Sequence, residues 1–492
     1  MKKKIFSTTI FIVLLIILLF ISITIFQDKS IHISKEMKEE EGTIESAWDF
    51  QENLKIGWNL GMSLSANIPY PKIIKYKLII EDNDNNCEES ELFICEDKNK
   101  YYANIKSLRN LKIEFDIPYT NLDGTLSWEI TELLINNKNI DINKQYISRV
   151  EKGKVIVTLD TINISYINQI DINIKINKFY EDNTLDKVDF YETFWCPDKT
   201  TKELLLTLKN AGFNAIRISF DVYNHIDEFG IIDSLWLNRL KEIVDYCIEL
   251  DIYCLVDIIE TYGLYVDDLN EKSINLYISL LKQVTSMFKD YNEKLLFSPF
   301  NEIRNSKGDW NTNNIEELNN INYLYQIFVD TIRSTGGNNK ERNLILTTYA
   351  AGISNEILNH FKIPNDTTKN HLLIECHNYQ PVRFTFNEIN LGNTDFLTEW
   401  GSYKDKQEMK KTFKTLNKFI KKTQIPLIIG EFGVVDRIEV NERIDYLQHY
   451  VKNAKKYNIG LFIFDDSYDF AIINRKTNQF INQEIIDVLT NN

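Results

Sequence analysis

The chain has 492 residues, of which 43% are hydrophobic and 12% aromatic, so it suits two or three globular parts and is not a disordered protein. Its formal net charge of -15 argues against binding of nucleic acid, because phosphate binding requires clustered Lys and Arg side chains. A neutral ligand such as a sugar meets no such objection.

The N-terminal residues carry the clearest targeting signal. Three lysines precede residues 5–26, an uncharged apolar stretch of 22 residues that is long enough to cross a bilayer as a helix. Signal-peptide cores usually run for only about 7 to 15 residues, and no A-x-A cleavage pattern follows here. We therefore expect residues 1–28 to be an uncleaved signal anchor in preference to a signal peptide, with a polar stalk over 29–46. Both forms predict an extracellular protein, secreted or anchored to the membrane by this segment.

A strand, "LKIGWNL", follows the stalk, and the pattern of apolar and polar residues then changes over residues 65–190. Stretches such as "LKIEFDI", "KVIVTL" and "IDINIKI" alternate apolar with polar residues, which is typical of half-buried antiparallel strands. We therefore expect an inserted β-sandwich here. Its role is left open between a structural lid or spacer and carbohydrate binding through exposed aromatics such as Tyr101, Tyr102 or Trp128.

From about residue 200 onward, short apolar strands alternate with amphipathic helices, a pattern that indicates a parallel sheet with crossover helices. Counting "LKIGWNL" as the first, eight strands can be recognised, which favours a (β/α)8 barrel (TIM barrel) of class α/β built from 47–64 plus 191–492. A doubly wound dinucleotide-binding sheet would need a glycine-rich phosphate turn, and the sequence has none.

Several predicted strands end on polar residues that a core would not select. In a (β/α)8 barrel these ends form the face that carries the active site. The second strand ends near Arg217, the fourth near Asn301 and Glu302, the sixth near His377 and Tyr379, and the seventh on Glu431, between two glycines in "GEFG". Two carboxylates across a barrel mouth suit glycoside hydrolysis, in which one protonates the leaving oxygen and the other attacks or directs water.

Each of these signals is weak alone. The dipeptide "NE" is common, His377 by itself would more often be a satisfied core histidine, and Arg217 would serve equally as a structural ion-pair partner. Taken together, in this order and at successive strand ends, they make a coincidence a poor explanation.

The barrel portion resembles glycoside hydrolase family 5, the endoglucanase-like retaining β-glycanases. The matching stretches include "KIGWNLGMSL", "FNAIRISF", "FSPFNEIR", "ECHNY", "IIGEFGVVDR" and "GLFIFDDS". The resemblance implies that Glu302 is the acid/base and Glu431 the nucleophile of a double displacement. It further implies substrate-side or supporting roles for Arg217, Asn301, His377, Tyr379 and His225. It implies no metal and no organic cofactor.

Two departures from the family pattern matter most, beside Met62 in place of an asparagine and Ile303 in place of a proline. The third strand usually ends in a histidine pair, where this chain has Ile259 and Glu260. The eighth usually supplies a tryptophan beneath the sugar, where this chain has Phe464, and Trp400 is an alternative stacking residue. Because Glu302, Glu431 and the residues around them are kept, the resemblance implies a retaining endo-β-1,4-glycanase acting on plant-type polysaccharide. A catalytically weak or inactive surface protein that only binds glycan is the alternative.

Overall fold

The computed structural model describes residues 44–65, 75–81, 87–89, 93–94, 99–105, 110–116, 124–140, 145–151, 154–159, 167–181, 187–196, 198–227, 229–258, 263–386 and 397–491. Across these ranges we find no helix that combines the length and the apolar character needed to cross a bilayer. The apolar stretch 5–26 lies outside the described residues, so its role as a signal or anchor stays a prediction.

Eight parallel strands close into a barrel in the order β1-β12-β13-β14-β15-β16-β17-β18. The strands are β1 (Gly57–Leu60), β12 (Ala215–Ser219), β13 (Tyr253–Asp257), β14 (Leu295–Ser298), β15 (Leu344–Thr347), β16 (Leu372–His377), β17 (Leu427–Phe432) and β18 (Gly460–Asp465). β1 pairs in parallel with both β12 and β18, which closes the sheet on itself. The predicted (β/α)8 barrel is therefore confirmed.

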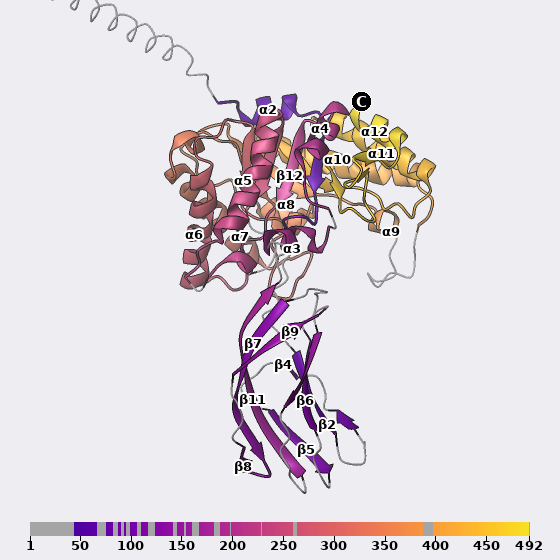
Figure 1. Ribbon diagram of the computed structural model, residues 1–492. Coiled ribbons are helices and arrows are strands. Elements are labelled where there is room, and N and C mark those ends of the chain that lie inside the picture. The colour runs from indigo at the N-terminus through magenta and orange to yellow at the C-terminus, as the bar shows by residue number, and fades with distance from the viewer. Residues whose placement is uncertain are drawn as a thin grey trace, which may run out of the picture. The chain divides into compact units, whose positions relative to one another are not determined.

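Helices pack around the outside of this barrel (Figure 1). They are α3 (Lys187–Phe194), α4 (Lys202–Asn210), α5 (Ser234–Glu249), α6 (Glu271–Met287), α7 (Ile315–Ser334), α8 (Asn355–His360), α10 (Tyr403–Thr423), α11 (Val440–Lys456) and α12 (Gln483–Thr490). Shorter elements lie in the connections, namely η1 (Tyr223–His225), η2 (Gly337–Lys340), η3 (Tyr349–Ala351), α9 (Val382–Thr385), β19 (Ile473–Asn474) and β20 (Gln479–Phe480). The long helices bury one apolar stripe each against the strands, as their 3.6-residue periodicity requires.

The interior of the barrel changes from apolar to polar along the strands. Near the N-terminal ends, inward residues such as Leu255, Ile345 and Leu373 share one apolar cluster with α2 (Ala47–Asn53), which packs into it through Phe50. Two residues further along the strands, where alternation returns the side chain to the interior, the buried residues are polar. They are Arg217, Asp257, Ser298, Thr347 and Glu375. The polar layer lies at the strand ends where a barrel places its active site.

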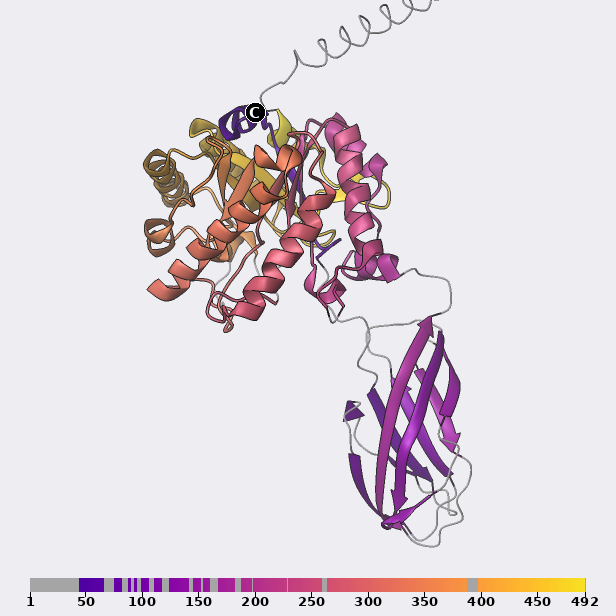
Figure 2. The same cartoon turned by 90° about the vertical axis from the view of Figure 1, so that its left-hand side faces the viewer.

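The inserted segment folds as the predicted β-sandwich of two antiparallel sheets (Figure 2). One sheet holds β2 (Lys75–Glu81), β3 (Cys87–Glu89), β4 (Phe93–Ile94), β6 (Asn110–Asp116) and β10 (Lys154–Leu159). The other holds β5 (Asn99–Ile105), β7 (Gly124–Ile135), β8 (Lys138–Asn139), β9 (Gln145–Val150) and β11 (Ile167–Glu181). Apolar residues from both sheets form a single core, separate from that of the barrel.

Trp128 belongs to this core and is not the exposed sugar-binding aromatic that the sequence suggested. Its side chain is fully buried, it stacks on Tyr146 with ring centroids 4.3 Å apart, and its indole N–H donates to Ser148 Oγ over 3.0 Å. Burial of a large aromatic ring is favourable once its polar N–H has a partner, which explains this position. The side chains of Tyr101 and Tyr102 lie outside the described residues.

Candidate active site

A β-bulge in β17 aims Glu431 into the barrel mouth. Cys376 of β16 pairs with Ile429, but the next residue, His377, pairs with Glu431, so Gly430 is the extra residue. Bulges of this kind re-aim a side chain and are common beside active sites. A Cβ on Gly430 would stand 1.7 Å from Oε1 of Glu375, so only glycine fits at this point of the bulge.

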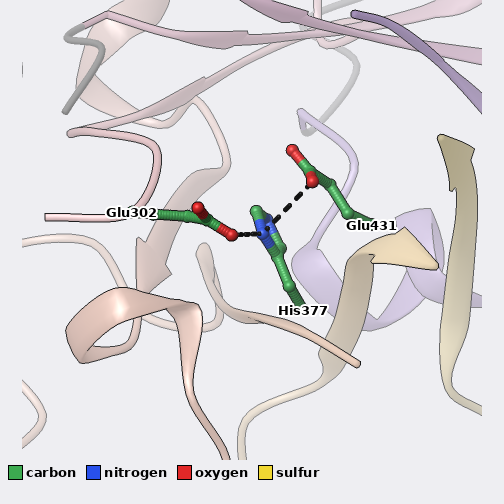
Figure 3. Close-up of side chains that lie close together, drawn as sticks. All are labelled: Glu302, His377 and Glu431. Carbon is green, nitrogen blue, oxygen red and sulfur yellow. Dashed lines mark hydrogen bonds and ion pairs between the residues drawn. The ribbon is translucent and has the colours of Figure 1, made fainter. Parts of the chain in front are cut away.

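His377 lies between the two acidic side chains that the sequence singled out (Figure 3). Its Nδ1 is 2.6 Å from Oε1 of Glu302 and 3.6 Å from Oε2 of Glu431. The nitrogen and one oxygen of each carboxylate all lie within 4.8 Å of one another. Glu302 follows β14 and keeps 17% of its side-chain surface exposed, against 10% for Glu431. Both carboxylates thus remain open to a ligand.

Arg217 lies beneath the two carboxylates and is fully buried. Its Nη1 donates to Oε1 of Glu431 over 2.9 Å, and its Nη2 donates to Oδ1 of Asn301 over 2.8 Å. Further contacts join Nε to Glu375 at 2.6 Å, Nη2 to Asp257 at 2.8 Å and Nη1 to Ser219 Oγ at 3.4 Å. The rigid guanidinium fork therefore fixes groups from several strands at once.

Glu375 and Asp257 are site residues that the sequence reasoning missed. Glu375 is completely buried, and besides Arg217 it accepts hydrogen bonds from Thr347 Oγ1 over 3.1 Å and Ser298 Oγ over 3.5 Å. Both acids are charged residues inside apolar strands, "LLIECH" and "YCLVD". A charged side chain is rarely buried in a protein unless it has a partner. A single acidic residue in an otherwise apolar strand is therefore the sequence signal that would have identified Glu375 and Asp257.

Several carboxylates face the side chains of Arg217 and His377, and these contacts determine the protonation states at the site. Burial lowers the pKa of His377, but the charge of Glu431 and hydrogen bonds to Glu302 and Glu375 raise it to about 10 in spite of the opposing charge of Arg217. The imidazole is therefore charged at neutral pH. Burial raises the pKa of Glu431, and the charge of Glu302 adds to this rise, while His377 and Arg217 oppose it.

Tyr379 and Phe464 form the aromatic side of the mouth. The hydroxyl of Tyr379 donates to Oε2 of Glu431 over 2.9 Å, and burial followed by the charge of Glu431 raises the pKa of this hydroxyl well above its usual value. Phe464, at the end of β18, meets the Tyr379 ring edge to face with centroids 6.3 Å apart and is only partly buried. An aromatic ring is thus present where the family places one, but it is a phenyl ring.

Two predicted substrate-binding residues do not belong to this cluster. His225 is 3% exposed and stacks on Trp236 at 4.1 Å, with Tyr191 against its edge, so the imidazole is part of the packing between η1 and the outer helices. Trp400 is 6% exposed and packs edge-on against Tyr446 of α11. Rings covered in this way offer no face to a sugar, which corrects both predictions.

The other departures from the family pattern are not equally visible. Ile259 and Glu260, at the position of the missing histidine pair, lie outside the described residues. Glu302, His377 and Glu431 would suit a cation by spacing alone. The short hydrogen bond between His377 and Glu302 accounts for their approach, and we assign these residues to acid-base chemistry.

The fold and this cluster define the class of the chain: a (β/α)8 barrel whose mouth is equipped for acid-base chemistry on a bound ligand. The sequence profile of the cellulase family (glycosyl hydrolase family 5) matches residues 178–469. The chain therefore belongs to glycosyl hydrolase family 5, as its motifs predicted.

Individual relatives agree with this assignment. Endoglucanase B of Neocallimastix patriciarum is 33% identical over 311 residues, which cover 61% of this chain and 63% of that protein. This chain thus spans less than two thirds of that relative's length. A broad-specificity endoglucanase of Ruminococcus champanellensis, solved with cellotriose bound, superposes with a TM-score of 0.57 at 30% identity, covering 61% of this chain and 88% of that one. A lichenase of Caldicellulosiruptor sp. F32 gives 0.58 at 32% identity, covering 63% and 89%.

Proposed function

We propose that this chain is a retaining endo-β-1,4-glycanase that hydrolyses plant-type polysaccharide by double displacement. The observation that carries the proposal is the approach of Glu302 and Glu431, whose nearest oxygens lie within 4.8 Å across the barrel mouth. Retaining enzymes hold their two carboxyl groups about 5 to 5.5 Å apart, whereas inverting enzymes need about 6.5 to 9.5 Å to admit a water. The short spacing supports direct attack by one of the carboxylates.

Glu431 is the better nucleophile of the two. Arg217 and Tyr379 each hold one of its oxygens, at 2.9 Å in both cases, so the carboxylate is oriented. The pKa of Glu431 is raised on balance by burial, and these two contacts limit that rise. In the first step Glu431 attacks the anomeric carbon while Glu302 gives its proton to the leaving oxygen. In the second step Glu302 takes a proton from the water that cleaves the glycosyl-enzyme bond.

The site and the relatives together support the proposed substrate class. The mouth is lined by carboxylates and hydrogen-bonding groups and bears an aromatic ring at Phe464, which suits the hydroxyls and the apolar face of a neutral sugar. The relatives are described as endoglucanases and a lichenase, and one was solved with a cellotriose. We place β-1,4-glucan and mixed-linkage glucan first, with xyloglucan and mannan behind.

The test is reducing-sugar release from β-glucan, carboxymethylcellulose, xyloglucan and mannan by the parent protein, beside Glu302→Ala and Glu431→Ala. We expect the parent to hydrolyse at least one glucan and both variants to lose about 1000-fold or more in kcat. A parent as inert as its variants that still binds glycan would favour the alternative, a surface glycan-binding protein.

The location outside the cell is a separate proposal that rests on the sequence of residues 1–28. Three lysines followed by a bilayer-length apolar stretch support export with the barrel outside and the segment held in the membrane. Fractionation of the full chain tests this proposal: we expect the protein in the membrane fraction and accessible to protease added to intact cells. Protein retained inside cells would contradict it.

A further inference from the structure

Glu375 is a buried carboxylate to which the mechanism proposed above gives no task. It lies on β16, two residues before His377, and its side chain is fully shielded from solvent. A buried carboxylate is costly unless charge and hydrogen bonds compensate. Here burial would raise the pKa of Glu375, but the charge of Arg217 and the hydrogen bond from His377 lower it to about 2, so Glu375 is an anion throughout the working range.

The surroundings of Glu375 are shaped to hold its carboxylate in one place. Oε1 accepts from Nε of Arg217 over 2.6 Å, and Oε2 faces the hydroxyls of Thr347 at 3.1 Å and Ser298 at 3.5 Å. On the remaining side the missing Cβ of Gly430 leaves the space that Oε1 fills. Four other strands of the barrel, β12, β14, β15 and β17, therefore contribute to the surroundings of this one side chain.

Two of the groups that contact Glu375, Arg217 and His377, also contact the catalytic pair. The guanidinium of Arg217 is planar, so an anchored Nε fixes the direction in which Nη1 reaches Glu431. The imidazole of His377 presents Nε2 to Oε1 of Glu375 at 3.4 Å and to Nη2 of Arg217, which Glu375 also holds, at 3.1 Å. This leaves Nδ1 directed at Glu302. One buried carboxylate thus orients both the cation behind the nucleophile and the histidine beside the acid/base.

We propose that Glu375 is a positioning residue for the double displacement, acting through Arg217 on Glu431 and through His377 on Glu302. This proposal rests on the proposed function of the site. In this role Glu375 does not contact the substrate. Its carboxylate sets the orientation of Arg217 and His377 and the share of their positive charge that is available to Glu431. Asp257, 2.8 Å from Nη2 of Arg217, takes part of that charge as well.

The charges facing these groups determine the sign of the expected effect. Glu431 is faced by Arg217 from β12, by His377 and Tyr379 from the end of β16, and by Glu302 from the end of β14. A second acid on Arg217 leaves less of its charge for Glu431. Removing that acid should therefore stabilise ionised Glu431 and lower the pH at which the nucleophile is lost.

Glu375 itself is faced by Arg217, by His377 and by the neighbouring thiol of Cys376, whose pKa is raised by burial and then by Glu375. Loss of the Glu375 charge weakens one of three carboxylate contacts to His377. The other two, with Glu302 and Glu431, remain, so His377 stays protonated over the acidic limb and does not reverse the sign there.

The test is the pH profile of kcat/KM for Glu375→Gln, which keeps the shape and removes the charge. A glutamine fits, because its amide oxygen can accept from Arg217 while its NH₂ group faces the two hydroxyls. We expect kcat to fall about tenfold or more and the acidic limb to move about 1 pH unit lower. Glu375→Asp keeps the charge on a shorter side chain, so kcat should fall while the acidic limb stays near the parental pH.

Glu192→Gln is the matched control. Glu192 is another fully buried glutamate that pairs with an arginine, 2.7 Å from Nε of Arg239, but it lies in α3 among the outer helices. Its loss should lower the melting temperature and leave the pH profile in place. A Glu375→Gln enzyme with parental kcat and parental acidic limb would overturn the proposal, as would an equal shift in Glu192→Gln.

A second readout does not need activity. The ¹⁵N signals of His377, assigned with His377→Gln, should titrate near pH 10 in the parent and at lower pH in Glu375→Gln, because one stabilising contact is gone. An unchanged titration would overturn the positioning role even if the variant is inactive. If the parent protein cleaves no polysaccharide, the proposed function is contradicted. The titration of His377 still decides whether Glu375 orients that histidine.

Discussion

Gly430 of β17 packs against Glu375 of β16 so closely that a Cβ on the glycine would stand 1.7 Å from Oε1 and 2.7 Å from Cδ of the glutamate. The glutamate cannot simply swing aside, because Arg217 holds it over 2.6 Å. We predict that Gly430→Ala breaks this buried pair and destabilises the protein by about 2 kcal/mol or more, with a large loss of kcat. Urea denaturation and kinetics measure the two effects.

A double variant separates the clash from any general intolerance of β17 to a side chain. Gly430→Ala combined with Glu375→Ala should be no less stable than Glu375→Ala alone, because the carboxylate that the new methyl meets is absent. Additive losses in the double variant would show that Gly430 is needed for another reason.

The hydroxyl of Tyr379 donates to Oε2 of Glu431 over 2.9 Å and lowers the pKa of that carboxyl. Tyr379→Phe removes the donor alone. Since a hydrogen bond to a charged group contributes about 1.5 to 3 kcal/mol, we expect kcat/KM to fall about 10- to 100-fold. The pKa of Glu431 should rise further, so the acidic limb of the pH profile should move to higher pH. A limb that moves lower or stays would contradict the assignment of Glu431 as the ionised nucleophile.

The raised pKa of His377 predicts that the free energy of unfolding falls at alkaline pH. Its pKa is raised from 6.5 to about 10, since the effect of the facing carboxylates exceeds the cost of burial. The native state therefore binds a proton that the unfolded chain has already lost, so the stabilisation is complete below pH 6.5 and disappears as the pH rises towards 10. Urea denaturation should show a loss of up to about 1.4 kcal/mol per pH unit in this window.

His377→Gln should flatten that slope, because the variant has no imidazole to titrate. His360→Gln, at an exposed position in α8, is the control and should keep the parental slope. An equally steep slope in His377→Gln would mean that another group causes the alkaline loss.

Phe464 and Trp400 give opposite predictions although both are aromatic. Phe464 is partly exposed beside Tyr379 in the mouth, so Phe464→Ala should weaken sugar contact by about 1 kcal/mol and raise KM about fivefold. Trp400 is buried against Tyr446, so Trp400→Phe should lower the melting temperature and leave kcat/KM within twofold of the parent, about 0.4 kcal/mol or less. A large change in KM for Trp400→Phe would restore the stacking role.

The sequence foretold the barrel because strand and helix periodicities alternate clearly from residue 200 onward, and it foretold the order of the strand ends on which Arg217, Glu302 and Glu431 lie. These are local signals. What it missed depends on contacts between strands: Glu375 reads as an anomaly within "LLIECH" until Arg217 is seen 158 positions away in sequence, 2.6 Å from its carboxylate.

The predictions for His225 and Trp400 were wrong for a related reason. His225 and Trp400 occur in loops after barrel strands, where substrate-binding residues are common, but only packing decides which way a loop side chain turns. His225 turns onto Trp236, and Trp400 turns onto α11. Trp128 of the sandwich illustrates the same limit, because a tryptophan on an alternating strand faces either solvent or core according to the register.

The measurement that bears most directly on the account is ¹H NMR during cleavage of a β-linked cello-oligosaccharide by the parent protein. The signal of the anomeric proton reports the configuration of the first product. Attack by Glu431 followed by attack of water inverts the anomeric carbon twice, so the product should appear as the β anomer before mutarotation. An α anomer as first product would contradict the assignment of Glu302 and Glu431 as a retaining pair.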